Sequence, residues 1–290
     1  MNIVLAIATH GRPRILSETL AFLANQQRQP EQILVAYADP SDIGDAPARY
    51  PHVTFLKTAL GLTRQRNAAL ALVSDCDLLL FLDDDFYPDP AYLRITEQLF
   101  LDHPEVVAST GRVLADDIKG PGLTVAQAKA IVAANPTDLG EQQITQTLLA
   151  YGCNMCLRME TIRRYALRFD ETLPLYGWYE DWDFSGQLAS YGSIVQISNA
   201  CGVHLSVKSG RITGVRMGYA QVANPIYLAR KGTFLWSNVF RFIVGPFFKN
   251  MVRSLAPEAH VDRLGRFRGN LAAFRDLLAG TLSPQQITDL

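Results

Sequence analysis

The residues Leu78-Leu79-Leu80-Phe81-Leu82-Asp83-Asp84-Asp85 decide the fold. Five large apolar residues in a row are typical of a strand that is buried on both faces. The carboxylates then mark the point where this strand leaves the carboxyl edge of a sheet, which is where open α/β sheets bind ligands. We therefore predict an α/β fold with a mostly parallel central sheet flanked by helices.

The three aspartates at the end of this strand indicate a cation site. Alternation along a strand places Asp83 and Asp85 on one side and Asp84 on the other. Two carboxylates about 4 Å apart repel each other by about 4 kcal/mol at an effective dielectric constant of about 20. A divalent cation removes this repulsion, and an all-oxygen cluster suits Mg²⁺ or Mn²⁺ better than Zn²⁺. The alternative is an inert acidic loop solvated by water.

Length and composition allow one large α/β domain with an appendage. The chain has 290 residues, of which 48% are hydrophobic, and a formal net charge of -1, which gives no electrostatic case for binding nucleic acid. The first apolar run has no basic leader and stops at His10, too early for a signal peptide, so we expect a cytoplasmic protein. Cys153 and Cys156 have the spacing of half a zinc site or a redox pair, but no second pair accompanies them, and we expect buried free thiols.

The first forty residues predict a strand at residues 2–8, a helix at 13–29 and a second strand at 33–38. The loop from Thr9 to Arg12 between the first two elements has a single glycine. This excludes both the GxGxxG dinucleotide pattern and the Walker A pattern. Any nucleotide at this edge of the sheet is therefore held in another way.

Charged residues follow the second strand and open the next helix. Asp39 either accepts a hydrogen bond from a pyrimidine ring N–H or caps a turn. Arg64 and Arg66 lie in the first turns of a helix that starts near Thr63, where the helix dipole favours acids. Two arginines in this place indicate an anionic ligand, or an ion pair with Asp39 or Asp75.

The middle of the chain adds a further strand and a second acidic cluster. Residues 106–110 predict the strand, and residues 116–146 are helical in composition. The segment Trp178-Tyr179-Glu180-Asp181-Trp182-Asp183 opens a helix that ends at Tyr191. Its acids are either dipole partners of the helix or a general base beside an aromatic platform that stacks on a sugar; its aromatics are otherwise core. His204, in a strand, is either a core residue or a metal ligand.

The order of these features resembles that of the family 2 glycosyltransferases with the GT-A fold. The resemblance covers residues 3 to about 210 and rests on motifs that occur in the right order: Thr9-His10-Gly11-Arg12, Asp39, Arg66-Asn67, Asp83-Asp84-Asp85, Phe169-Asp170-Glu171, Glu180-Asp181 and His204. The first motif departs from the usual Thr-Tyr-Asn-Arg type. The resemblance implies a GT-A catalytic domain at residues 1–210, a C-terminal helical region at 211–290, and inverting transfer of a sugar from a nucleotide diphosphate-sugar to an acceptor hydroxyl.

The resemblance also implies a role for each site residue. The donor, most simply a UDP-sugar, is held by Thr9, Arg12, Asp39, Arg66, Asp83 and Asp84, of which Asp83 reaches the ribose and Asp84 contacts the sugar or acts as a structural partner. Mn²⁺ or Mg²⁺ on the diphosphate is held by Asp85 and His204. Asp181 is the catalytic base, and the acceptor or sugar contacts are Trp178, Glu180, Trp182 and Asp183. This requires the acids at 83–85 and those at 180–183 to converge on one pocket.

The segment from residue 234 to 248 is apolar but shorter than the roughly 20 residues that span a membrane. Arg241, Lys249 and Arg253 share one helical stripe, which resembles an interfacial helix. Pro246 should kink or divide this helix. The alternatives are packing on the catalytic core or on a second subunit. We expect peripheral contact through residues 234–268 with the cytoplasmic face of the inner membrane. We also expect the acceptor to be a glycan or a lipid-linked molecule, in the synthesis of cell-surface polysaccharide or glycolipid.

Two other functions are compatible with parts of this pattern. A sugar-phosphate nucleotidyltransferase uses a similar sheet, but it predicts a glycine-rich basic loop after the first strand, which residues 8–13 do not supply. A non-catalytic nucleotide- or glycan-binding module would bind UDP with metal and turn nothing over. Replacement of Asp181 distinguishes this module from an enzyme, because only the enzyme needs the base.

Overall fold

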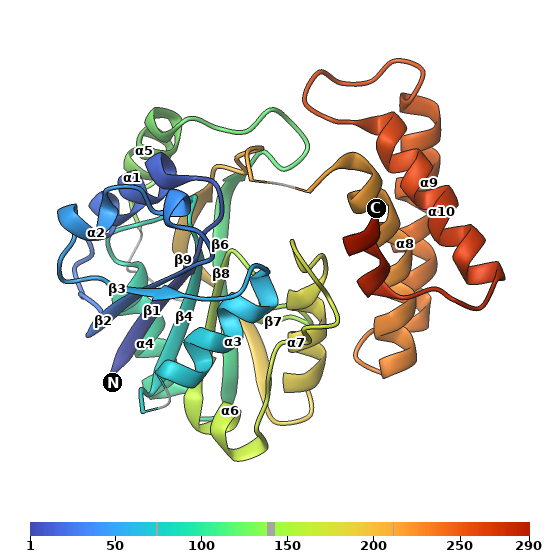
Figure 1. Cartoon of the computed structure of the whole chain (residues 1–290). Helices are drawn as coiled ribbons and strands as arrows, with labels where there is room; N and C mark the ends of the chain where they lie inside the picture. Colours follow the sequence, from blue (N-terminus) through green and yellow to red (C-terminus); the bar gives the residue numbers. More distant parts are fainter. Residues whose placement is uncertain (74, 138–142, 211) are drawn as a thin grey trace. The chain divides into compact units, whose positions relative to one another are not determined.

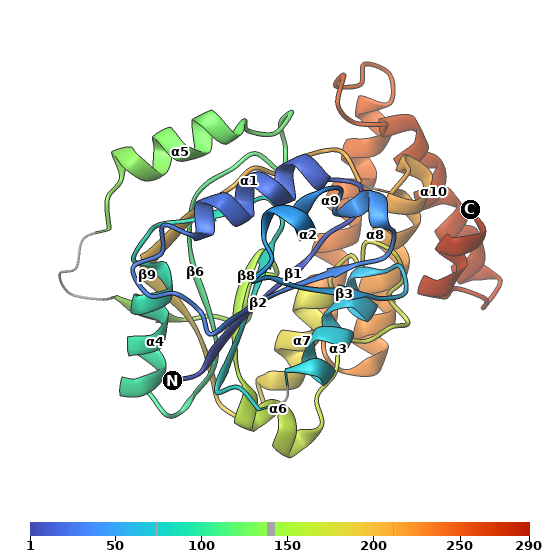
Figure 2. The ribbon, with the colours of Figure 1, turned by 60° about the vertical axis from the view of Figure 1, so that its left-hand side comes forward.

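The computed structural model describes residues 1–73, 75–137, 143–210 and 212–290. Its contacts divide the chain into two compact units. The first contains Met1–Leu60, Arg64–Arg168 and Gln187–Gly210, and the second contains Gly61–Thr63, Phe169–Gly186 and residues 212–290. Figures 1 and 2 show the first unit as an open sheet with helices and the second as a group of helices.

The sheet of the first unit positions the predicted site residues. In spatial order its strands are β3 (Thr54–Lys57), β2 (Gln32–Tyr37), β1 (Ile3–Ala8), β4 (Leu78–Asp83), β8 (Asn154–Arg158), β6 (Val106–Asp116), β9 (Ser193–His204) and β5 (Phe86–Pro88), with β7 (Ile144–Gln146) paired to β9. The strands from β3 to β4 run parallel, as do β6 and β9, whereas β5, β7 and β8 run antiparallel to their neighbours. The predicted α/β class is confirmed, in a sheet of mixed direction.

Helices cover both faces of this sheet. α1 (Pro13–Leu23) and α4 (Tyr92–Asp102) pack on the face that carries Leu80 and Leu82. α3 (Leu62–Leu72) lies at the other face, where the Arg66 guanidinium is 5.3 Å from the ring centre of Phe81. Pro13 begins α1 because its fixed φ suits the first helical position. The remaining helical segments before the second unit are η1 (Pro40–Asp42), α2 (Ala46–Arg49), α5 (Val125–Ala134) and α6 (Met159–Tyr165).

Part of the secondary structure after residue 106 differs from the prediction. The strand expected at 106–110 continues as β6 to Asp116, and Ile144–Gln146 forms β7 where helix was expected. Pairing with β9 explains both differences, because β9 accepts β6 on one side and β7 on the other. Within the stretch expected to be helical, residues 138–142 lie outside the described part. All four cysteines are free and buried, as expected.

The second unit is built on three long helices: α8 (Gly214–Lys231), α9 (Trp236–Arg253) and α10 (Arg263–Leu278), followed by η2 (Pro284–Asp289). α8 and α10 approach closely at two glycines: a Cβ on Gly218 would lie 2.0 Å from the Arg266 carbonyl oxygen, and one on Gly269 the same distance from that of Val215. α9 is continuous through Pro246, so of the two expected effects of this proline, a kink or a division of the helix, the division does not occur. None of the helices that the structure describes has both the length and the apolar character needed to cross a membrane.

Contacts also place residues 169–186 with the C-terminal helices, whereas the sequence division at residue 210 put them in the catalytic domain. Lys231 of α8 bonds Asp170 at 2.7 Å and Asp183 at 2.8 Å. Aromatic residues from the segment join the apolar core of this unit, which includes Leu173, Tyr219 and Phe234. The segment therefore takes its partners from residues about fifty positions later, which local patterns do not show.

Candidate active site

The aspartates that end β4 lie where the sequence placed them, at the carboxyl edge of the sheet. Parallel pairing sets Asp83 beside Ala8, so the loop that begins at Thr9 leaves the sheet at the same edge. The chain then turns into β5, which pairs with β9 so that Phe86 is opposite His204. This register brings His204 next to Asp85, although 119 positions separate them in the sequence.

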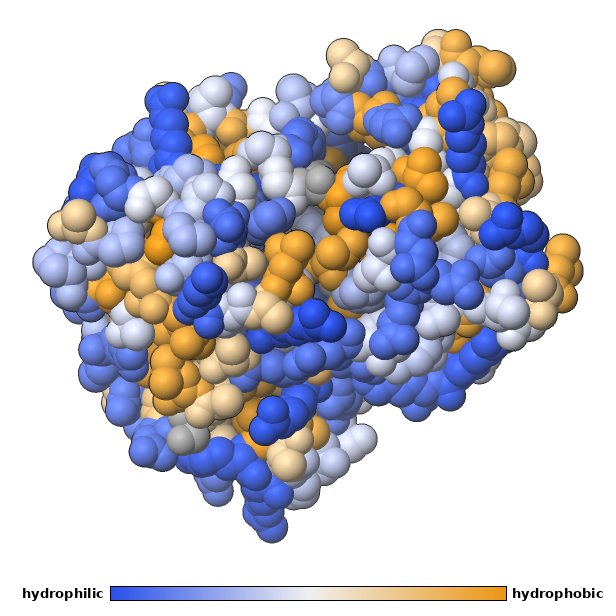
Figure 3. Space-filling model, viewed as in Figure 1, coloured by the Kyte–Doolittle hydropathy of each residue, from blue (hydrophilic) through white to orange (hydrophobic). Residues whose placement is uncertain are grey.

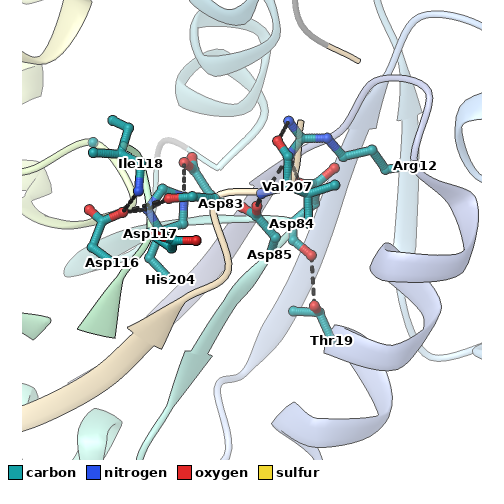
Figure 4. A network of polar contacts seen from close by, with 12 residues as sticks. Arg12, Thr19, Asp83, Asp84, Asp85, Asp116, Asp117, Ile118, His204 and Val207 are labelled. Atoms are coloured by element: carbon teal, nitrogen blue, oxygen red, sulfur yellow. Dashed lines mark hydrogen bonds and ion pairs between the residues drawn. The ribbon is translucent and has the colours of Figure 1, made fainter. Parts of the chain in front are cut away.

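Asp83, Asp85 and His204 form a cluster of metal-binding character. One ligand atom from each lies within 4.8 Å of the other two. His204 Nε2 is 3.3 Å from Asp85 Oδ1 and 3.7 Å from Asp83 Oδ2. Asp85 and His204 are buried, at 1% and 6% exposure. The alternation predicted for the aspartates is confirmed, because Asp84 points to other partners (Figure 4).

Asp84 is a buried structural carboxylate. Its Oδ2 accepts a hydrogen bond from Thr9 Oγ1 at 2.7 Å, and its Oδ1 accepts one from Arg12 Nη1 at 2.8 Å. Arg12 also donates to the carbonyl oxygens of Val207 and Ser209. Burial raises the pKa of Asp84 to about 6, although Arg12 favours the charged form. These contacts favour the structural alternative for Asp84, and the donor contacts of Thr9 and Arg12 stay predictions.

His204 has a second carboxylate partner that the sequence analysis missed, Asp116 at the end of β6. His204 Nδ1 lies 3.3 Å from Asp116 Oδ1. Asp116 is held in place in turn, because Ser206 Oγ donates to its Oδ1 at 2.5 Å and the Tyr151 hydroxyl donates to its Oδ2 at 2.9 Å. A carboxylate in this position fixes the tautomer of a metal-binding imidazole and leaves Nε2 to face the cation. Asp116 would have been found if the strand had been predicted to reach residue 116. The length of β6 is set by its pairing with β9, which the local sequence does not show.

The charges in this cluster shift one another's titration. Burial would lower the pKa of His204, but Asp85 and Asp116 outweigh burial and raise it to about 10. Burial disfavours the charged form of Asp85, yet His204 beside it brings the pKa of this carboxyl below its usual range. For Asp83, burial dominates over Arg66 and raises the pKa. A proton on Nε2 and a divalent cation would therefore serve the same purpose, the neutralisation of the neighbouring carboxylates of Asp83 and Asp85.

The donor set fits a divalent cation. Asp85 Oδ1 is buried and, among the described residues, accepts no hydrogen bond of regular geometry, while it faces His204 Nε2. Two carboxylates and one imidazole are ligands that Mn²⁺ accepts, and carboxylates also suit Mg²⁺.

Two other predicted donor contacts have local partners. Arg66 is 2% exposed, donates to the Gly152 carbonyl oxygen at 2.8 Å, and lies 3.4 Å from Asp83 Oδ1. Its unfavourable place at a helix start is thus offset by Asp83, and the described contacts show this pairing where the sequence suggested Asp39 or Asp75. Asp39 caps η1, with Oδ1 accepting from the Ser41 N–H at 2.9 Å. The pyrimidine contact predicted for Asp39 stays a prediction.

Asp42 organises this edge of the sheet and was not singled out from the sequence. Its side chain is 1% exposed. Oδ1 accepts from the Gly11 N–H at 2.7 Å and contacts His10 Nδ1 at 3.1 Å. Oδ2 accepts from the N–H groups of Ala38 and Asp39, at 3.1 and 2.8 Å. One carboxylate thus holds together the loops that follow β1 and β2; its signal was the capping pattern of residues 39–42.

The second acidic cluster opens α7 (Glu180–Leu188), and much of it belongs to the core of the second unit. Asp183 is fully buried and accepts from Lys231 Nζ at 2.8 Å and Thr233 Oγ1 at 2.6 Å. The ring of Trp182 packs edge-on against Phe234 and Phe242, with centroids 5.4 and 5.6 Å away. These contacts favour the core alternative for Trp182 and give Asp183 a structural ion pair that the sequence analysis did not predict. Their acceptor contacts stay predictions.

Trp178, like Trp182, packs against the apolar core of the second unit, and Glu180 and Asp181 complete the cluster. Trp178 packs on Tyr179, with ring centroids 5.0 Å apart. Glu180 is buried, whereas Asp181 is partly exposed and its Oδ1 accepts from the Trp182 N–H at 2.9 Å. The predicted convergence of this cluster with residues 83–85 stays a prediction, because the two groups belong to different units.

Comparison with known proteins identifies the family. A profile described as glycosyl transferase family 2 matches residues 4–162, which include the edge of the sheet formed by β1, β2 and β4. The chain belongs to glycosyl transferase family 2. It is therefore a glycosyltransferase, as the resemblance implied. A comparison with curated protein sequences finds no match.

Solved structures confirm the GT-A fold of this family 2 chain. S. aureus TarS 1-349 in complex with UDP-GlcNAc is 16% identical, with 95% of this chain and 81% of that chain covered and a TM-score of 0.57. The mannosyltransferase PcManGT from Pyrobaculum calidifontis, in complex with GDP-Man and Mn²⁺, is 12% identical, with coverages of 99% and 85% and a TM-score of 0.58. GalNAc-T7 with UDP, GalNAc and Mn²⁺ is 13% identical, with coverages of 99% and 58% and a TM-score of 0.57. At these identities the likeness establishes the fold alone.

Proposed function

We propose that this glycosyltransferase moves a sugar, with inversion at the anomeric carbon, from a UDP-sugar to an acceptor hydroxyl in a reaction that depends on Mn²⁺ or Mg²⁺. The observation that carries the proposal is the cluster of Asp83, Asp85 and His204, whose ligand atoms lie within 4.8 Å of one another. A cation there would stabilise the negative charge that develops on the departing diphosphate. The nucleotides and Mn²⁺ held by proteins of this fold support the donor class.

Asp85 and His204 would hold the cation, with Asp83 beside them. Asp83 divides its carboxylate between two partners: Oδ1 faces Arg66 at 3.4 Å, and Oδ2 faces His204 at 3.7 Å. Arg66 therefore fixes the Asp83 side chain so that one oxygen points toward the cation position. Asp116 would orient the His204 ring from the other side. The ribose contact of Asp83 is a further part of the proposal.

Asp181 is our proposed catalytic base. It is partly exposed in the first turn of α7. A carboxylate at a helix start is stabilised as the anion, which is the form that accepts a proton. Such a carboxylate is a weak base, but it needs to act only as the acceptor hydroxyl becomes acidic in the transition state. Trp178 and Glu180 on the same segment are the proposed acceptor contacts.

We further propose a glycan or lipid-linked acceptor and a role in cell-surface polysaccharide or glycolipid synthesis at the cytoplasmic face of the inner membrane. The support is the apolar and cationic character of residues 234–268. An acceptor that is anchored in lipid would require the enzyme to work at a membrane surface.

The test uses the full chain with Mn²⁺, a panel of UDP-, GDP- and dTDP-sugars, and free and lipid-linked glycan acceptors. We expect acceptor-dependent release of UDP from one donor, with inversion seen by NMR of the product. Asp181→Asn should abolish transfer and leave UDP and Mn²⁺ binding in calorimetry unchanged. The control Glu171→Gln, at an exposed acid of the same unit, should change neither transfer nor binding. Binding of UDP and Mn²⁺ without turnover of any donor would overturn the proposal in favour of a binding module.

A further inference from the structure

α9 has an exposed apolar face that the core of its own unit does not use. The side chains on this face are large, and their exposed fractions are 58% for Trp236, 73% for Phe240, 53% for Phe248 and 60% for Val252. They are spaced by four residues or a multiple of four, and each step of four turns by about 40° round the helix. They therefore form one inclined stripe, in which Phe240, Phe248 and Val252 lie within about 120° of one another. Leu255, just after the helix, extends the stripe and is 89% exposed.

The opposite face of α9 anchors the helix. Val239 and Ile243 are buried in the apolar core of the second unit. Asn250 is fully buried and donates to Gln221 of α8 at 2.9 Å and to Asn270 of α10 at 3.0 Å. The inner face thus fixes the orientation of α9, and the apolar stripe is presented outward by a packed helix.

Cations accompany this stripe. Arg241, Lys249 and Arg253 each follow one of its apolar residues directly, so they form a second stripe about 100° further round the helix. All three are exposed, and α9 contains no Asp or Glu. In Figure 3, hydrophobic residues in orange alternate with hydrophilic residues in blue over the upper right, where Figure 1 draws α9 and α10. An aromatic stripe beside a cationic one is the pattern of a helix that lies in the headgroup region of a bilayer.

We propose that this face of α9 docks on an anionic lipid bilayer, with the helix in the plane of the surface, its aromatic stripe at the acyl boundary and its arginines among the headgroups. Charge selects this occupant over a second copy of the chain. A two-fold contact would bring the same cationic stripe of two copies together, and like charges at an interface disfavour it. An anionic lipid surface instead complements all three cations.

The structure also limits which arginines take part. Arg263 lies within residues 234–268, the segment expected to contact the membrane, but it is 5% exposed and pairs with Glu258 at 2.8 Å. It also donates to Asn250 Oδ1 at 3.0 Å. Arg263 therefore belongs to the junction of α9 and α10, and the lipid contact rests on α9.

The test measures co-sedimentation of the full chain with vesicles of phosphatidylcholine alone and of phosphatidylcholine mixed with phosphatidylglycerol. We expect binding to the anionic vesicles that weakens with salt. Phe240→Ser should lower the partition coefficient about tenfold or more, because the variant lacks the phenyl group that the bilayer would bury. Arg241→Gln should lower it about fivefold. The matched controls are Leu101→Ser, at an exposed leucine of α4, and Arg14→Gln, at an exposed arginine of α1, which should leave it unchanged.

Circular dichroism separates loss of binding from loss of folding, and Phe248→Ser provides a second apolar variant. Absence of binding to anionic vesicles, or equal binding of the wild type and of folded Phe240→Ser and Arg241→Gln, would overturn the proposal. A concentration-dependent dimer that Phe240→Ser dissociates would overturn it in favour of a second copy. This docking rests on the membrane-surface part of the proposed function. The assay contains no donor or acceptor, so loss of vesicle binding would overturn the docking and leave the proposed sugar transfer untouched.

Discussion

Asp42→Ala tests whether one carboxylate holds together the two loops that start the site. The substitution removes the acceptor of three backbone N–H groups, those of Gly11, Ala38 and Asp39, at 2.7, 3.1 and 2.8 Å. It also removes the partner of His10 Nδ1. The side chain is buried, so water does not share these bonds in the native state.

The magnitude follows from the number of bonds and their surroundings. A hydrogen bond to a charged group contributes about 1.5–3 kcal/mol. Gly11 is exposed and Asp39 is partly exposed, so water will replace part of the loss. We expect the free energy of unfolding of the first unit to fall by about 3–5 kcal/mol, a change of about 10²–10⁴ in the folding equilibrium. Asp42→Asn should recover about half of this loss, because the amide keeps one acceptor oxygen but turns an NH₂ group toward two donors.

Hydrogen exchange measured by mass spectrometry on peptides covering residues 9–16 and 36–43 is the assay. It reports the three amides directly and does not require the two units to unfold together. Asp45→Ala is the matched control, an exposed aspartate in the next turn of the chain. Should Asp42→Ala leave the exchange of the Gly11 and Asp39 amides unchanged, with stability within about 0.5 kcal/mol of the wild type, the assignment of Asp42 as the link would be wrong.

Three further predictions concern other parts of the chain. Asp116→Asn should lower the affinity for Mn²⁺ in titration calorimetry about 10- to 100-fold, because it weakens the group that orients His204. Lys231→Met removes the cation between two carboxylates. Because the Lys231 side chain is partly solvated, the free energy of unfolding of the second unit, followed by tryptophan fluorescence in urea, should fall by about 1.5–3 kcal/mol. Burial opposes charge on Asp170, but the hydrogen bonds from Lys231, Thr172 and Tyr227 together outweigh burial and lower the pKa of this carboxyl. Wild-type stability should therefore fall as pH drops below about 4, and Lys231→Met should flatten this dependence. Gly218→Ala places a Cβ 2.0 Å from a carbonyl oxygen of α10 and should lower the melting temperature.

Each of these predictions has a control. Asp102→Asn changes an exposed acid on α4 and should leave Mn²⁺ affinity unchanged. Arg230→Met changes the exposed neighbour of Lys231 and should cost under about 0.5 kcal/mol. A Cβ on Gly245 meets nothing within 4 Å, so Gly245→Ala should be neutral or stabilising. Equal effects of a variant and its control would contradict the contact on which that prediction rests.

The sequence alone determined those features that depend on neighbouring residues. Alternation in Leu78–Asp85 placed Asp83 and Asp85 on one side of the strand, and the structure confirms it. The order of short motifs was enough to predict a family 2 glycosyltransferase with the GT-A fold, which the family profile and the solved structures confirm. These patterns can be recognised in the sequence because the side chains of strands and helices repeat their direction every few residues.

The tertiary structure alone decided the partners that come from distant parts of the chain. Asp116 reaches His204 because β6 runs beside β9 over its whole length, a register that the residues of β6 do not encode by themselves. Lys231 donates a hydrogen bond to Asp183 and holds it in the core of the second unit. A carboxylate at a helix start is otherwise equally suited to bind an acceptor. In both cases the residue type allows several roles, and the role is set by which charged or apolar group the fold places within about 3 Å of it.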